Sequence, residues 1–227
     1  MAKAEAEAER VRTESQIEIS DLQRRAFYRF LEEEAKKQKN IEEITRQALP
    51  QLDAKSKPEQ VEDDWITNFF DKCRLISDSE MQSLWSRVLA GEANVPGAYS
   101  KRTVNFLSSL GKSEAQLFTN LCTLGWILND VFVPVIYDIR AEIYKKWGIH
   151  FSSLKHLGSI GLIQFDSLSG YRRLRLPKRI AARYYGTSTI LEFEKETENE
   201  MSIGHVLLTQ IGHELAPISG SQPDAEF

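Results

Sequence analysis

The first 49 residues of the chain contain neither glycine nor proline, and Pro50 is the first residue of either type. These two residues are the ones that most readily interrupt a helix, and the opening tract AKAEAEAERVR consists largely of strong helix formers. We therefore predict one long charged helix over residues 1–50, with a break near Lys39 and Asn40 as the alternative. Because the chain begins inside a repetitive Ala/Glu tract, we also expect a further segment upstream of Met1.

One face of this predicted helix is apolar in its second half. Ile19, Leu22, Ala26 and Phe30 follow one another at spacings of three and four residues, which places them in one row along a helix. A polar helix of this length is rarely stable alone, since most helical stability comes from tertiary packing. We expect the row to pair with a second copy of the chain in a short coiled coil. The alternative is that the helix packs onto its own domain from Ile19 onward and frays before that residue.

The segment 63–97 has the most strongly helical pattern in the chain. Apolar residues recur there every three or four positions in two stretches, Trp65, Ile66, Phe69, Phe70 and Cys73, then Met81, Leu84, Trp85, Val88 and Leu89. With a third helix after Ser100, the pattern predicts a helical subdomain over residues 60–111. The adjacent carboxylates Asp63 and Asp64 are expected to interact with the N-terminal dipole of the first of these helices.

Capping signals locate the ends of these helices. Ser77 and Glu80 match a capping box that would open the second helix. Gly91 is predicted to end that helix, because helices commonly end at glycine. Ser100 is predicted to cap the third helix.

Helices continue beyond Gly111 and then give way to strands. Three further helices are predicted, from Ser113 to Leu124, from Ile139 to Trp147 behind a cap at Asp138, and after a cap at Ser152 or Ser153. A β-hairpin is predicted next, from Gln164 to Asp166, through a turn at 167–170, to Tyr171–Leu176. Further strand candidates lie at 182–185, 190–193 and 203–208, and Thr209 is expected to cap a closing helix. We predict a mainly α, α+β fold with a small antiparallel sheet in a module over residues 113–217, followed by a polar tail at 218–227.

Two stretches of the module resemble a known fold. The order helix, helix, helix, hairpin over 113–176 resembles a winged-helix module, and SSLKHLGSIGLIQF resembles the end of its recognition helix running into the first wing strand. LLTQIGHEL is similar to the strand-to-helix ending that follows the wing. The extra strand candidates between 182 and 206 depart from that pattern, so the resemblance implies an elaborated winged helix.

A second resemblance covers the chain nearly end to end. The Ala/Glu tract, DDWITNFF, SDSEMQSLWSRVLAGEANVPGAYSKRTVNFLSSL and LTQIGHEL are similar to an uncharacterised bacterial family known as domain of unknown function 2806. The block MQSLWSRVLAGE is its most specific part. The resemblance implies a bacterial, intracellular origin and brings no activity and no catalytic residues.

No catalytic arrangement is recognisable in the sequence. His213 and Glu214 begin like the H-E-x-x-H zinc motif, but Pro217 stands where the second histidine is needed. We therefore expect a protein that is not an enzyme, with no catalytic residues, no metal site and no cofactor. Cys73 and Cys122 both lie on apolar helical faces, which predicts buried free thiols in preference to a disulfide or a metal pair.

The composition indicates a soluble globular protein. Hydrophobic residues make up 41% and charged residues 27% of the chain, so a core of ordinary size can form. No apolar run approaches the roughly 20 residues that a membrane helix requires, and none resembles a signal peptide. Together with the two predicted free thiols, this favours a cytoplasmic protein without a membrane segment.

Basic residues gather in the C-terminal module. The candidates for nucleic-acid binding are Lys155, His156, Arg172, Arg173, Arg175, Lys178 and Arg179, which a winged helix would place on its recognition helix and at its wing. The net charge of -4 argues against indiscriminate binding to nucleic acid. The alternative is that these residues solvate a sheet face and pair with the acidic run Glu192–Glu200.

We therefore expect a non-enzymatic binding or assembly protein. Its N-terminal helix would oligomerise, and its winged-helix-like module would bind a macromolecular partner. The partner would be a second copy of the chain or another protein. The alternative function is a regulator that binds double-stranded DNA through the basic residues.

Overall fold

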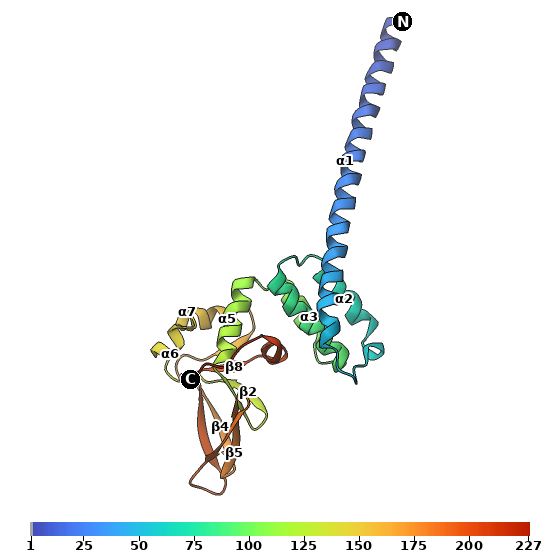
Figure 1. Ribbon diagram of the computed structural model, residues 1–227. Helices are drawn as coiled ribbons and strands as arrows, with labels where there is room; N and C mark the ends of the chain where they lie inside the picture. The colour runs from blue at the N-terminus through green and yellow to red at the C-terminus, as the bar shows by residue number, and fades with distance from the viewer. Residues whose placement is uncertain (1) are drawn as a thin grey trace.

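The N-terminal fifth of the protein is a single helix. The computed structural model describes residues 2–227, apart from the side chains of residues 2–4 and 17. Its first element, α1 (Ala2–Ala48), runs without interruption, so the predicted long helix is confirmed and no break occurs near Lys39. Figure 1 shows that α1 projects far from the rest of the protein. The other elements begin beside the C-terminal end of this helix.

Only the last turns of α1 are packed. Asn40, Ile44 and Ala48 are buried, whereas the described side chains between residues 5 and 33 are exposed, with Asp21 partly so. The helices that cover α1 lie beside its C-terminal end alone (Figure 1). The prediction that α1 packs onto its own domain from Ile19 onward is therefore wrong, because no element reaches that far along the helix.

Three helices form the subdomain that holds α1. They are α2 (Asp63–Cys73), α3 (Ser79–Asn94) and α4 (Lys101–Leu107). Its centre is aromatic: the ring of Phe69 stacks on Trp65 at 5.1 Å between centroids and meets Trp85 edge-on at 5.2 Å. Burying each such side chain stabilises the fold by roughly 1.5–3 kcal/mol. Both apolar stripes predicted for this segment thus face the core.

Two of the predicted helix boundaries differ from the observed ones. Asp78, rather than Ser77, caps α3, and its Oδ1 accepts hydrogen bonds from the amides of Glu80 (3.0 Å) and Met81 (3.1 Å). Because Asp78 lies one position closer to α3 than Ser77, its carboxylate accepts these hydrogen bonds in place of the Ser77 hydroxyl. Gly91 lies inside α3, where a Cβ atom would come within 2.6 Å of the Tyr99 ring, so the glycine makes room for that ring.

Four helices belong to the C-terminal module, and the one predicted at Ile139–Trp147 is shorter than expected. Besides α5 (Lys112–Thr123), the module contains α6 (Glu142–Lys145), α7 (Phe151–Ser159) and α8 (Gln210–Leu215). α5 is opened by Glu114, whose carboxylate accepts from the Gly111 amide at 2.8 Å, and not by the predicted pair Ser113 and Gln116. His150, rather than either predicted serine, caps α7 through its Nδ1. Thr209 caps α8, as predicted.

The strands of the module form three antiparallel groups. A four-stranded sheet has the order β2-β1-β5-β6, from β1 (Gly125–Leu128), β2 (Val131–Pro134), β5 (Arg179–Tyr184) and β6 (Thr187–Glu192). β3 (Ile163–Phe165) pairs with β8 (Val206–Leu208), and β4 (Tyr171–Leu176) pairs with β7 (Asn199–Gly204). Small antiparallel sheets, as predicted for an α+β fold, are therefore present.

The predicted hairpin between 164 and 176 does not form. β3 and β4 are consecutive in the chain, yet each pairs with a strand from the C-terminal part. Ile163, Val206 and Leu208 are all buried in the main core, so pairing β3 with β8 buries both strands at once. Alternation of apolar and polar residues defines which face of a strand is buried, but not which strand it pairs with. The prediction of the pairing was wrong for that reason.

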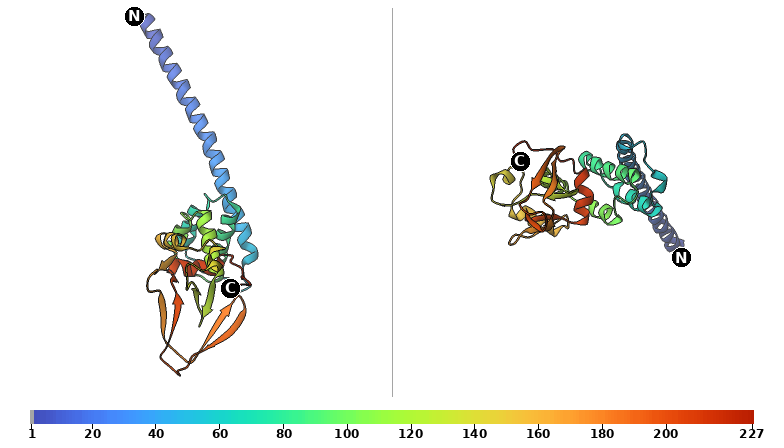
Figure 2. Two further views of the ribbon diagram at one scale, coloured as in Figure 1. Left: turned by 90° about the vertical axis from the view of Figure 1, so that its left-hand side faces the viewer. Right: turned by 90° about the horizontal axis from the view of Figure 1, so that it is seen from below.

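The two halves of the protein share one core. A single hydrophobic cluster includes Trp85 of α3, Leu121 of α5 and Val206 of β8, and a smaller second cluster lies between β1 and β7. The polar tail is also docked, because Asp224 accepts a hydrogen bond from the Trp147 indole at 2.9 Å and pairs with Lys146. Figure 2 shows that the β4–β7 and β5–β6 ribbons extend from the module in the direction opposite to α1.

Candidate functional site

The basic residues predicted to bind nucleic acid are distributed over several elements. Lys155 and His156 lie on α7, Arg172, Arg173 and Arg175 on β4, Lys178 just before β5, and Arg179 at its first position. Figure 1 shows α7 beside α5, whereas β4 and β5 extend away from the helices. The candidate residues are therefore spread along the module, with Lys178 and Arg179 farthest along the chain from α7.

Three of these cations pair with the acidic run 192–200. Arg172 lies 3.7 Å from Glu200, Lys178 lies 2.6 Å from Glu196, and Arg179 lies 3.1 Å from Glu192. All three are exposed ion pairs, each of which typically contributes between 0 and about 1 kcal/mol to stability. Their main effect is on the electrostatic potential at the surface, because each carboxylate neutralises one positive charge. The pairing that the sequence offered as an alternative is the arrangement observed.

Two further candidates make structural contacts. The ring of His156 lies 2.8 Å from the Glu114 carboxylate that opens α5. The hydrogen bond from the Gly111 amide is the main cause that holds the pKa of Glu114 below its usual value. Arg173 donates to the backbone carbonyl of Leu128 at 2.7 Å and so ties β4 to β1. Within the described chain, Lys155, Arg173 and Arg175 are the candidates without a carboxylate partner, and Lys155 lies over the Phe151 ring.

The exposed part of α1 carries the second candidate surface. We define the apolar row as Ile19, Leu22, Ala26 and Phe30. Ile19, Leu22 and Phe30 are 55%, 60% and 55% exposed. Further along α1, Ile41, Ile44 and Ala48 lie on the same side of the helix as this row, but the positions between Phe30 and Ile41 on that side carry the charged residues Glu33 and Lys37. This side of α1 is thus covered by α2 and α3 at its C-terminal end, and its apolar row at 19–30 is exposed.

Neither a cluster of potential metal ligands nor an exposed thiol occurs among the described residues. No group of three or more His, Cys, Asp or Glu side chains within residues 2–227 is placed to hold a metal ion. Cys73 and Cys122 are free and buried, and burial raises the pKa of each thiol to about 12, which makes both thiols poor nucleophiles. Glu214 accepts a hydrogen bond from the Ser100 amide at 2.8 Å, so it joins the two halves of the protein.

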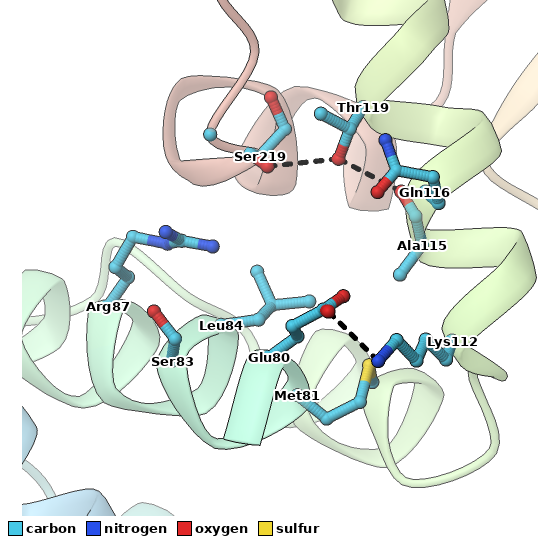
Figure 3. Close-up of a pocket in the computed structure, with 11 residues that line it drawn as sticks. Glu80, Met81, Ser83, Leu84, Arg87, Lys112, Ala115, Gln116, Thr119 and Ser219 are labelled. Carbon is cyan, nitrogen blue, oxygen red and sulfur yellow. Dashed lines mark hydrogen bonds and ion pairs between the residues drawn. The ribbon is translucent and has the colours of Figure 1, made fainter. Parts of the chain in front are cut away.

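A cleft between the two halves was not predicted from the sequence. It has a volume of about 310 Å³ and lies between α3, α5 and the segment that follows α8. Figure 3 shows the Arg87 guanidinium pointing from α3 into this space, toward Thr119 and Ser219. Lys112 at the other end of the cleft is paired with Glu80 at 2.9 Å. No local pattern could have revealed the cleft, because its lining comes from α3, α5 and residues 219–220, which are far apart in the chain.

None of the described helices combines the length and the apolar character needed to span a bilayer. A comparison with curated proteins and a comparison with solved structures both returned no match. A comparison with protein families matched residues 24–227, which include most of α1 and everything that follows it. The chain therefore belongs to the family described as protein of unknown function (DUF2806).

Proposed function

We propose that this protein is a non-enzymatic, cytoplasmic assembly protein whose apolar row on α1 binds the same row of a second copy. The observation that carries the proposal is that this exposed apolar row lies on the same side of α1 as the buried Ile44 and Ala48. Where α2 and α3 are present the face is covered, and beyond them Ile19, Leu22 and Phe30 remain in water. A second copy presents an identical uncovered row, so one isologous contact would cover both.

The size of the row supports a dimer of moderate affinity. Full burial of three large apolar side chains on each of two copies would contribute roughly 9–18 kcal/mol as an upper bound. Association costs an estimated 4–15 kcal/mol in lost freedom of motion, so only part of that gain remains. We therefore expect a dimer that dissociates measurably at micromolar protein concentrations.

The test is the molar mass in solution. Leu22→Asp places a charge in the middle of the row, and we expect light scattering to give a monomer at concentrations where the unchanged chain is a dimer. Tyr28→Asp is the matched control. Tyr28 is also 61% exposed, but it lies two positions from both Ala26 and Phe30 and so faces the other side of the helix. A monomeric unchanged chain, or equal loss of mass in both variants, would contradict the proposal.

We propose DNA binding by the C-terminal module as a second candidate. Lys155 and Arg175 have no carboxylate partner within the described chain, which supports it. The order α5, α6, α7 and then the β3–β8 pair is also compatible with a winged helix that carries residues 166–205 between its two wing strands. The ion pairs with Glu192, Glu196 and Glu200 weaken the positive field, and so this candidate ranks below assembly.

Duplex binding can be measured by fluorescence anisotropy over a range of salt concentrations. If the second candidate is correct, Lys155→Glu and Arg175→Glu will each weaken binding and lower the salt slope by about one unit. Arg102→Glu, which changes an exposed arginine on α4, is the control and is expected to have little effect. Failure of the unchanged chain to bind duplex at low salt would exclude this candidate.

A further inference from the structure

The cleft between α3 and α5 contains a cation without a counter-charge. Arg87 makes no ion pair and no hydrogen bond within the described chain, and its Nε is buried without a partner. Lys112, the other cation of the cleft, is neutralised by Asp78 (3.2 Å) and Glu80 (2.9 Å). Arg87 therefore differs from Lys112 in that no carboxylate of the described residues pairs with it.

The position of Arg87 makes this unusual. A guanidinium stays charged at any pH that a protein meets, and a charge that is partly removed from water is destabilising unless it is paired. Burial lowers the pKa of Arg87, which shows that its surroundings disfavour the charged form. The tail passes close by, because a Cβ atom added at Gly220 would lie 3.5 Å from one of the guanidinium nitrogens. The five N–H donors of this fork are arranged to bind a carboxylate or a phosphate through two parallel hydrogen bonds.

The rest of the cleft has the properties of a small-molecule site. Its volume of about 310 Å³ is at the lower end of the range for ligand pockets. Met81 and Leu84 provide an apolar floor on α3, and Ser83 and Gln116 provide polar groups on opposite walls. Figure 3 shows that these side chains and Arg87 surround a common space. One wall belongs to the helical subdomain and the other to the C-terminal module, so a bound molecule would contact both.

We propose that this cleft binds a small organic anion, whose carboxylate or phosphate group pairs with the guanidinium of Arg87 while its remainder lies on Met81 and Leu84. The space between the two walls, with an apolar floor beside the guanidinium, fits a small molecule that contacts α3 and α5 together. This site is independent of the apolar row on α1, and its test does not involve the oligomeric state.

The experiment is thermal unfolding of the full chain with two probes, inorganic phosphate and succinate, each compared with chloride at equal ionic strength. A ligand that binds only the folded protein raises Tm progressively with its concentration. We expect such a rise in the unchanged chain and in the control Arg102→Gln. In Arg87→Gln we expect the affinity to fall roughly tenfold or more, because two charge-assisted hydrogen bonds are lost. A response to only one probe would support the proposal and identify the anionic group.

A second variant keeps the test decisive if Arg87→Gln folds poorly. Ser83→Glu places a carboxylate one helical turn before Arg87, within reach of its guanidinium. We expect this internal counter-ion to raise Tm without any probe and to abolish the response to phosphate and succinate. The proposal is overturned if neither probe shifts the Tm of the unchanged chain, which would leave Arg87 available to a carboxylate of a protein partner. Equal shifts in the unchanged chain and in Arg87→Gln would also overturn it.

Discussion

The two ends of α1 differ in their surroundings much more than in their sequence. At the C-terminal end, Ile41, Ile44 and Ala48 pack against α2 and α3, while Ile19, Leu22 and Phe30 lie on the same side of the helix and are exposed to water. The spacing of apolar residues is equally helical in both parts. An apolar face on a helix therefore indicates that something covers it, but the sequence does not say whether the cover comes from the same chain. In α1, the same chain covers this face at the C-terminal end and leaves it exposed nearer the N-terminus.

The largest expected difference between the two ends is in the effect of removing one isoleucine. Ile44→Ala leaves a cavity beside α3, and we expect the free energy of unfolding to fall by about 2–5 kcal/mol. Ile19→Ala removes the same atoms from an exposed position and is expected to change the stability of the monomer by less than about 0.5 kcal/mol. Urea unfolding at protein concentrations low enough to prevent association measures both. Similar losses in the two variants would mean that residue 19 is covered within the monomer.

A smaller effect is expected at the boundary between the two parts. Asn40 donates from its side chain to the carbonyl of Arg74 at 2.8 Å, and its Oδ1 accepts from the side-chain amide of Gln82 at 3.4 Å, so it links α1 to the end of α2 and to α3. Asn40→Ala leaves the Arg74 carbonyl without this partner, and we expect a loss of roughly 1–3 kcal/mol.

Hydrogen exchange can locate that loss. If Asn40 fixes the place where α1 leaves the core, amide protection in Asn40→Ala will decrease mainly over residues 34–44 and little in the C-terminal module. Gln38→Ala is the control, because the side chain of Gln38 is exposed and bonds only to Glu42 on the same helix. Loss of protection spread evenly over the whole protein would show that Asn40 has no such local role.

The sequence predicted those features that depend on neighbouring residues. The long helix and the two stripes around Phe69 and Trp85 follow from local periodicity, and all three are present. The closing cap at Thr209 was also predicted, because its acceptor and donor are three residues apart. Prediction failed at the start of α3, where Asp78 and Ser77 are adjacent alternatives and only the geometry of the turn decides between them.

Features that depend on residues far apart in the chain could not be predicted from the sequence. Four strands were placed near their observed positions, but the partner of β3 is determined by the burial of Val206 and Leu208, more than forty positions away. The same holds for the candidate sites. The basic residues could be identified, and pairing with the run Glu192–Glu200 could be offered as an alternative, whereas the partner of each cation depends on how the strands and the loop between them are arranged. Arg87 resembles any other polar position of a helix until the distant Thr119 and Gly220 are placed beside it.

The smallest expected effect concerns the ion pairs that lie along the exposed part of α1. Arg29 lies 3.4 Å from Glu33, and both side chains are more than half exposed, at 76% and 54%. A pair of this kind stabilises a helix by about 0.3–0.5 kcal/mol, and salt screens it. Because no tertiary contact supports this part of a monomer, we expect Glu33→Gln in the monomeric Leu22→Asp background to lower the helical circular-dichroism signal slightly, and molar salt to remove the difference. If the chain dimerises as proposed, the same substitution in an otherwise unchanged chain should have less effect, since the partner helix would supply the stability that local charges supply in the monomer. Equal sensitivity in the two backgrounds would contradict this expectation. It would show that local charges alone stabilise the exposed end of α1 and that no second copy covers it.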